Sequence, residues 1–260
     1  MTRVLSGAVL FILAIVIVWF VPPGLFFVVA ELLLLLAFSE YLTLARTGGL
    51  PVPPIPAGAA AMLTCAAFAT PSRPIDLVLM SALVALGTLT LTVWSNGRDG
   101  LGIASASLFP SLYLGLPFGA IVAIREIRGA GTLFLLMLTV IVSDTAQYYS
   151  GRAFGRRLLA PAISPKKTVE GAIGGLVFGG LTLAVAGAWW LPTAPLVVRV
   201  ALGMAIVAFG VAGDLFESML KRSANLKDSS DLIPGHGGVL DRIDALLFAA
   251  PVYYIVLKYV

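Results

Sequence analysis

Long apolar stretches, separated by short polar or Pro/Gly-rich segments, dominate the pattern of this chain. The core of a bilayer is crossed by about 20 apolar residues in a helix. A chain in lipid must satisfy its backbone hydrogen bonds internally, and unbroken apolar stretches of this length favour helices over a barrel. We therefore predict an all-α, polytopic integral membrane protein with about nine transmembrane helices. They lie at residues 4–21, 25–45, 55–71, 75–95, 101–124, 131–150, 169–191, 196–219 and 243–260.

The composition agrees with this interpretation. Hydrophobic residues make up 59% of the chain and charged residues 12%, whereas soluble domains carry about 25% charged residues. The first apolar stretch is longer than the apolar region of a signal peptide, which is about 7–15 residues, so we expect it to remain as a helix. The single cysteine, Cys65, lies inside an apolar stretch, where we expect it to pack.

The distribution of Lys and Arg predicts the orientation in the membrane. Cytoplasmic loops carry an excess of these residues, and with the N-terminus inside, 12 of the 17 fall on the cytoplasmic side. The two loops richest in charge, residues 150–168 and 220–242, then both face the cytoplasm. Because the positive residues flank apolar helices, the net charge of +4 reflects membrane orientation and does not indicate nucleic-acid binding.

The second of these loops contains a run of glycine and proline beside charged residues. Its centre reads Pro234-Gly235-His236-Gly237-Gly238, and glycines permit positive φ and a close approach of backbone N–H groups to an anion. This pattern predicts a turn that cradles phosphate. Cations suited to phosphate and carboxylates suited to a divalent metal flank the turn: Lys221, Arg222, Lys227, Asp228, Asp241, Arg242 and Asp244.

Two more carboxylates lie toward the ends of predicted membrane helices. Asp144 and Asp214 are each placed near the cytoplasmic side, beside the same two loops. A charge at the centre of a bilayer costs about 2.5 kcal/mol or more, so an ionisable group in a span is a functional-site hypothesis by default. Mg²⁺ prefers one or two carboxylates together with substrate oxygens. The residues alone thus predict a metal-competent, phosphate-binding site that faces the cytoplasm beside lipid.

Structural interpretations remain open for several of these residues. Charged residues of inner loops often serve only to orient the helices. Lys166 and Lys167 follow Ser164-Pro165 and precede Thr168-Val169-Glu170, a pattern typical of a helix entry that presents the lysines. His236 can equally hydrogen-bond within its own turn. Glu31 and Glu40 have no motif around them and are interpreted as structural, and the glycines of residues 171–180 indicate a close helix-packing face.

The polar motifs resemble those of the phosphatidate cytidylyltransferases, also called CDP-diacylglycerol synthases. The pattern is Ser218-x-x-Lys221-Arg222, Lys227-Asp228, then Pro234-Gly235-His236-Gly237-Gly238-x-x-Asp241-Arg242-x-Asp244. Residues 164–171, residues 213–218 and the stretch from Asp144 to Gly155 are similar to the same family, although Gln147 stands where that family more often has a small residue. The resemblance covers the C-terminal half. We expect one integrated membrane domain, with N-terminal helices in residues 1–130 and the catalytic loops in residues 131–260.

The resemblance implies that CTP and phosphatidic acid are converted to CDP-diacylglycerol and pyrophosphate, with Mg²⁺ and room for a second metal ion. It also implies a bacterial inner-membrane location, and small-residue helix faces would allow a homodimer. The implied metal ligands are Asp214 and Asp241, supported by Asp144 and Asp244. The implied catalytic residues are Asp214, Asp241, Lys221, Arg222, Lys227 and His236. The implied nucleotide-binding residues are Lys166, Lys167, Gly235, Gly237, Gly238 and Arg242.

Three other functions compete with this one. A CTP-dependent polyprenol kinase would also need a metal site among helices, but it would release CDP instead of pyrophosphate. A CDP-alcohol phosphotransferase would show a DG-x-x-AR…G…D…D spacing, which the sequence lacks. A secondary transporter would place carboxylates in interrupted helices related by an internal repeat, and no repeat is evident in the sequence.

Overall fold

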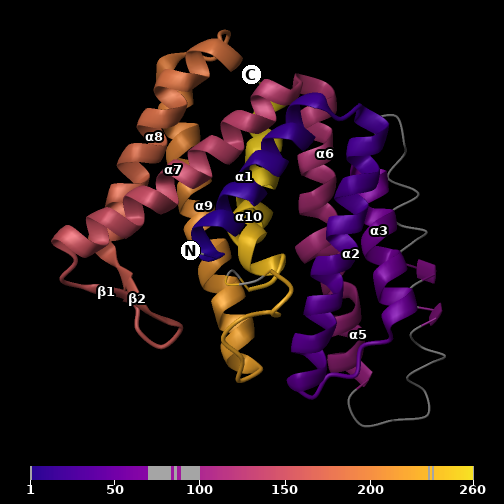
Figure 1. Ribbon diagram of the computed structural model, residues 1–260. Helices are drawn as coiled ribbons and strands as arrows, with labels where there is room; N and C mark the ends of the chain where they lie inside the picture. The colour runs from indigo at the N-terminus through magenta and orange to yellow at the C-terminus, as the bar shows by residue number, and fades with distance from the viewer. Residues whose placement is uncertain are drawn as a thin grey trace. The chain divides into compact units, whose positions relative to one another are not determined.

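The computed structural model describes residues 2–69, 83–84, 87–88, 100–233, 235 and 237–259, with side chains from residue 7 onward (Figure 1). The predicted helix at 75–95 falls mostly outside these residues. The N-terminal elements are α1 (Thr2–Phe20), α2 (Pro23–Thr47), α3 (Pro54–Ala69), α5 (Gly100–Pro110), the π-helix η2 (Ser111–Gly115) and α6 (Leu116–Arg128). The C-terminal elements are α7 (Ala130–Phe154), β1 (Leu158–Ala160), β2 (Ser164–Thr168), α8 (Val169–Trp190), α9 (Leu196–Ser223) and α10 (Leu240–Leu257).

The predicted all-α membrane fold is confirmed. Among the described residues, five helical stretches are long and apolar enough to cross a membrane: 23–47, 100–128, 130–154, 169–190 and 196–223. Two shorter apolar helices, Gly7–Phe20 and Pro54–Ala69, accompany them. The number of nine spans stays a prediction.

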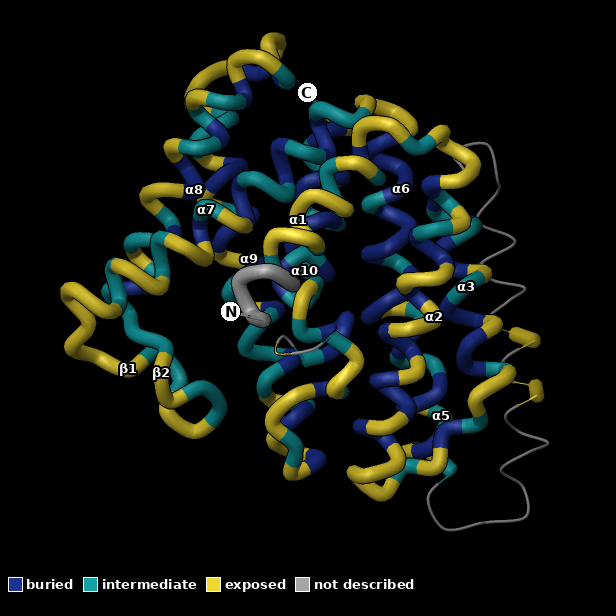
Figure 2. Tube along the Cα trace, in the orientation of Figure 1, coloured by how far each residue is buried: buried dark blue, intermediate teal, exposed yellow. Residues whose placement is uncertain are grey.

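The outer faces of these helices are apolar, as lipid contact requires. On α8, Ile173, Val177, Leu181, Val185 and Trp189 are all more than half exposed and recur every four residues. Figure 2 shows the resulting exposed stripe along α8. Because residues four apart lie close together on the surface of a helix, these side chains give α8 an exposed apolar surface of the kind expected for contact with lipid.

The chain divides into two compact units. The first comprises residues Met1–Ala123 and Leu220–Arg242, and the second comprises Ile124–Met219 and Ile243–Val260.

The first unit packs α2 and α3 against the α5–η2 stretch. A Cβ at Gly115 would fall against the carbonyl oxygen of Ala61, so only glycine lets η2 approach α3 this closely. The Tyr41 hydroxyl of α2 donates a 2.6 Å hydrogen bond to the carbonyl oxygen of Ala106 in α5. The π-helix follows Pro110, which has no backbone N–H to continue the α-helical ladder.

The second unit packs α7, α8 and α9 through small residues. A Cβ at Gly171 would lie 2.8 Å from the carbonyl oxygen of Gln147 in α7, and one at Gly203 would lie 2.7 Å from the carbonyl oxygen of Gly179. This confirms the packing face predicted for residues 171–180. The strands β1 and β2 form an antiparallel hairpin at one end of α7 and α8 (Figure 1). The hairpin was not predicted, because SPKKT shows no alternation of apolar and polar residues.

Candidate active site

The β1–β2 hairpin and the start of α8 present the paired lysines of the second unit. The Oγ1 atom of Thr168 accepts a 3.1 Å hydrogen bond from the backbone N–H of Gly171, which caps α8 as the predicted helix entry requires. Glu170 accepts the N–H groups of Arg156 and Arg157, at 3.0 and 3.2 Å, through its Oε2 atom. The Glu170 side chain therefore connects the segment that enters β1 to the start of α8, next to the lysines of β2.

Lys167 joins a group of carboxylates drawn from three helices. Its Nζ atom lies 2.5 Å from Oδ2 of Asp214 in α9, and the two side chains are 21% and 34% exposed. Asp144 of α7 and Asp244 of α10 lie near enough to interact electrostatically with both Asp214 and Lys167. A Cβ at Gly213 would lie 2.6 Å from the carbonyl oxygen of Asp244, so glycine permits the close approach of α9 and α10 here. The structure thus brings together three of the four predicted metal ligands.

The oxygen donors of this group suit Mg²⁺, which favours carboxylates. Three neighbouring carboxylates repel one another when they are ionised, and Lys167 supplies one positive charge among them. Within the described part of the chain, no three acidic, histidine or cysteine side chains are arranged to hold a metal ion as they stand. The donor chemistry fits the ion, and Lys167 contacts only the Oδ2 oxygen of Asp214.

The fourth predicted ligand, Asp241, is the hub of a network in the first unit. Its Oδ1 atom accepts a 2.5 Å hydrogen bond from Nζ of Lys221. Its Oδ2 atom accepts the N–H of Ser229 at 2.9 Å, the hydroxyl of Ser229 at 2.7 Å and the N–H of Gly238 at 2.8 Å. Burial alone would raise the pKa of this carboxyl, but these hydrogen bonds, led by the one from Lys221, outweigh burial and lower its pKa to about 2.

The N-terminal half contributes a residue to this network that sequence reasoning interpreted only as structural. Glu40 of α2 is buried, and its carboxylate receives the N–H groups of Val239 and Leu240, each at 2.8 Å. The hydroxyls of Ser229 and Ser230 lie 2.9 and 2.7 Å from its two oxygens. Only one signal could have indicated Glu40, namely a carboxylate inside a predicted span.

Two glycines of the α9–α10 loop (residues 224–239) lie so close to these carboxylates that a side chain would not fit. Gly237 has φ +78°, and a Cβ there would lie 2.7 Å from Oδ2 of Asp241. A Cβ at Gly238 would lie 2.5 Å from each oxygen of Glu40. Gly235 is exposed and has φ +77°. The positive φ values expected for this turn are confirmed at Gly235 and Gly237, but the N–H of Gly238 is bound by Asp241, and phosphate binding by the turn stays a prediction.

The other predicted basic residues lie at the surface. Lys166, Arg222, Lys227 and Arg242 are exposed, and the guanidinium of Arg222 donates to the carbonyl oxygen of Leu226 at 3.1 Å. His236 and Pro234 lie outside the described residues. The helix α9 carries Asp214 and Lys221, and α10 carries Asp241 and Asp244, so each helix contributes to both groups of polar residues. A metal ion shared by Asp214 and Asp241 stays a prediction.

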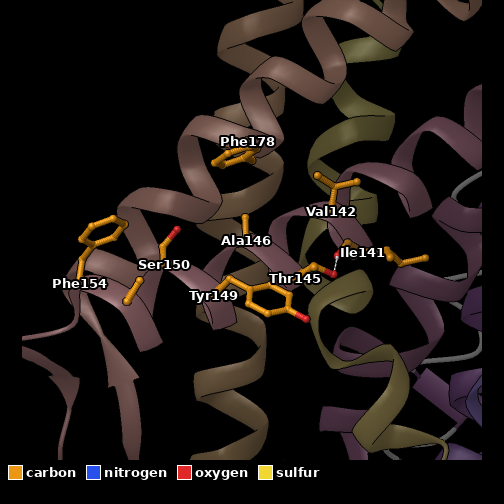
Figure 3. Close-up of a pocket in the computed structure, with 9 residues that line it drawn as sticks. Ile141, Val142, Thr145, Ala146, Tyr149, Ser150, Phe154 and Phe178 are labelled. Atoms are coloured by element: carbon orange, nitrogen blue, oxygen red, sulfur yellow. Dashed lines mark hydrogen bonds between the residues drawn. The ribbon is translucent and has the colours of Figure 1, made fainter. Parts of the chain in front are cut away.

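An apolar groove of about 510 Å³ lies along α7 and α8, lined on α7 by Val142, Ala146, Tyr149 and Ala153 and on α8 by Phe178 (Figure 3). These α7 positions recur every three or four residues and form one face of the helix. Asp144 precedes Ala146 by two residues, which is about 200° around a helix of 3.6 residues per turn. Most of the groove thus lies away from Asp144 on α7, and Ile141, about one turn before Asp144, forms the edge of the groove nearest to it.

Comparison with known proteins agrees with these motifs. The model of a family described as the cytidylyltransferase family matches residues 1–260. A phosphatidate cytidylyltransferase of Aquifex aeolicus is 39% identical over 151 residues, covering 57% of this chain and 54% of that protein. The enzyme of the same name from Bacillus subtilis is 33% identical over 187 residues, covering 70% of this chain and 67% of that protein. The one from Haemophilus influenzae is 49% identical over 129 residues, covering 46% and 44%.

The matched segments span about half to two thirds of the length of these relatives. The family model, in contrast, matches the whole chain, including the N-terminal helix that carries Glu40. This chain belongs to the cytidylyltransferase family.

Proposed function

We propose that this protein transfers the cytidylyl group of CTP to phosphatidic acid, giving CDP-diacylglycerol and pyrophosphate in phospholipid biosynthesis. One observation carries the proposal: Lys167 lies against Asp214 within a group of carboxylates at the ends of membrane helices. Such a group offers both a cation for phosphate and oxygen ligands for a metal. The names of the relatives supply the substrates, because they are phosphatidate cytidylyltransferases.

The reaction needs no nucleophile from the protein. A phosphate oxygen of phosphatidate attacks the α-phosphorus of CTP and forms a new P–O bond, while the bond from that phosphorus to the bridging oxygen of the β-phosphate breaks. The electron pair leaves with pyrophosphate. The enzyme's task is therefore to position two anionic groups and offset their repulsion.

The basic residues of the chain share that task in this proposal. Lys166 and Lys167 approach the triphosphate from the hairpin, and Lys221, Arg222, Lys227 and Arg242 serve the triphosphate or the lipid phosphate. Asp144, Asp214, Asp241 and Asp244 would hold Mg²⁺, with room for a second ion. When bound, such an ion neutralises phosphate charge and stabilises the departing pyrophosphate.

The site suits substrates of opposite solubility. Phosphatidate keeps its acyl chains in lipid, and CTP arrives from the cytoplasm. We place the N-terminus and the site on the cytoplasmic side, because the excess of Lys and Arg lies in the loops on that side. The bacterial relatives support a location in the bacterial inner membrane. A homodimer stays a prediction, since the glycines that suggested it pack within one unit.

The test is a product analysis with the purified protein in detergent. CTP labelled at the α-phosphorus, phosphatidate and Mg²⁺ should give a labelled lipid, whereas CTP labelled at the γ-phosphorus should label only pyrophosphate. Transfer of the γ-label to a lipid would instead indicate a kinase. Asp241→Asn should abolish the labelled lipid while the protein remains inserted in the membrane, and retained turnover would remove Asp241 from the ligands.

A further inference from the structure

We propose that Glu40 is a positioning residue that anchors the α9–α10 loop and the start of α10, and so sets the place of the Asp241 carboxylate. The anchoring itself follows from contacts within the first unit, and its effect on turnover rests on the function proposed above. Neither the family comparison nor the sequence motifs assign a role to Glu40.

The donors that reach the carboxylate of Glu40 all come from this loop and the first residue of α10. Two oxygens offer about four lone-pair sites. Two backbone N–H groups and the hydroxyl of Ser230 donate to three of them, and the hydroxyl of Ser229 donates to the fourth when it does not donate to Asp241. The side chain is only 4% exposed, so water cannot replace these donors. A buried charge that accepts several hydrogen bonds from one loop holds that loop in one conformation.

Glu40 also caps α10 from a distance. The first N–H groups of a helix have no partner within it, and those of Val239 and Leu240 point to the two oxygens of Glu40. A negative charge at a helix N-terminus is stabilised by the helix dipole. This contact fixes the first turn of α10, on which Asp241 stands.

Ser229 connects Glu40 directly to Asp241. Its hydroxyl oxygen lies 2.9 Å from Oε2 of Glu40 and 2.7 Å from Oδ2 of Asp241. The hydroxyl has one hydrogen, so it donates to one carboxylate at a time. A change at Asp241 that weakens its hydrogen bond with Ser229 therefore strengthens the hydrogen bond from Ser229 to Glu40.

The same contact explains Gly238. The space that a Cβ would need there is filled by both oxygens of Glu40 and by the hydroxyl of Ser229. The backbone of the loop thus directly contacts Glu40, almost 200 positions earlier in the chain. Without this contact, the loop would be held mainly by Asp241 itself.

Glu40→Gln tests the anchor. The amide keeps one acceptor oxygen but places an NH₂ donor against donors of the loop. Glu31→Gln is the matched control, because Glu31 is a second buried glutamate of α2 and forms a hydrogen bond with Cys65 of α3, far from the loop in sequence. Hydrogen exchange of the full-length protein in detergent, without substrates, should be about tenfold faster or more in the 229–240 segment of Glu40→Gln. The control should match the wild type.

Turnover supplies the second readout. In Glu40→Gln we expect kcat to fall about tenfold or more, with the KM for phosphatidate changed less than about threefold. Ser230→Ala removes the hydroxyl that donates to Glu40 and leaves the backbone contacts, so it should give a smaller change of the same kind. Ser230→Ala also tests the anchor if Glu40→Gln does not fold.

The outcomes separate the two proposals. Unchanged exchange of the 229–240 segment in both Glu40→Gln and Ser230→Ala would overturn the anchor. Faster exchange with unchanged kcat would overturn its role in catalysis. If the wild type makes no labelled lipid, the proposed function fails, while the exchange experiment still decides whether Glu40 holds the loop.

Discussion

The Nζ atom of Lys221 lies 2.5 Å from Oδ1 of Asp241, with the two side chains only 11% and 6% exposed. The two residues stand on either side of the α9–α10 loop, 20 positions apart. Removal of one partner from a buried ion pair typically costs about 3–5 kcal/mol. The loop therefore depends on both charges, whatever further role either residue has.

This pair gives the loop a predictable dependence on pH. The pKa of Asp241, about 2, is below the value of about 3.9 in an unfolded chain. Its contribution to stability is then fully present above about pH 4 and is lost as the pH falls toward about 2. Lys221→Met removes the hydrogen bond that lowers the pKa of Asp241 most. As the pH falls, the loop of this variant should therefore open at a higher pH than the loop of the wild type. Proteolysis of the loop across pH 2–6 measures this, and Lys227→Met, at an exposed position, should leave the profile unchanged.

Asp214 should be required for turnover. Asp214→Asn removes the partner of Lys167 and one charge from the carboxylate group, so formation of labelled lipid should fall by roughly 100-fold or more. Asp231→Asn is the control, because it removes the same charge from an exposed loop position. Equal activity of the two variants would contradict a role for Asp214.

Gly237 should tolerate no side chain. Gly237→Ala combines the strain of φ +78° with a contact between its Cβ and Asp241. Gly49→Ala carries similar strain, at φ +84°, but meets no atom within 4 Å. Each should lose about 1–2 kcal/mol of stability through strain, yet only Gly237→Ala should also lower turnover. Thermal unfolding and product formation, measured side by side, test this difference.

The packing of α8 against α9 should depend on Gly203. A Cβ at this position would lie 2.7 Å from the carbonyl oxygen of Gly179 and 2.9 Å from Cα of Gly180, which are backbone atoms and cannot rotate away. Gly203→Ala should therefore destabilise the protein by about 1–3 kcal/mol. Gly24→Ala, where nothing lies within 4 Å, should be neutral or slightly stabilising. A thermal shift in detergent distinguishes the two.

The membrane helices were predictable because their signal is local. The stretch predicted at 169–191 is the helix Val169–Trp190, and the one predicted at 25–45 is Pro23–Thr47. The span predicted at 196–219 continues as a helix to Ser223. Lys221 and Arg222 end the apolar run there, but charged residues do not end a helix. Hydropathy alone therefore places the membrane segment better than it places the helix end.

The amino-acid sequence by itself determined the helical membrane class, the family motifs and the candidate charged residues, because apolar length and motif spacing are properties of neighbouring positions. Only the tertiary structure decided that Lys167 pairs with Asp214, that Lys221 pairs with Asp241 and that Glu40 holds the α9–α10 loop. These partners are between 20 and 200 positions apart in the chain. Their choice depends on which surfaces of the folded helices meet, and no local pattern of residues records that.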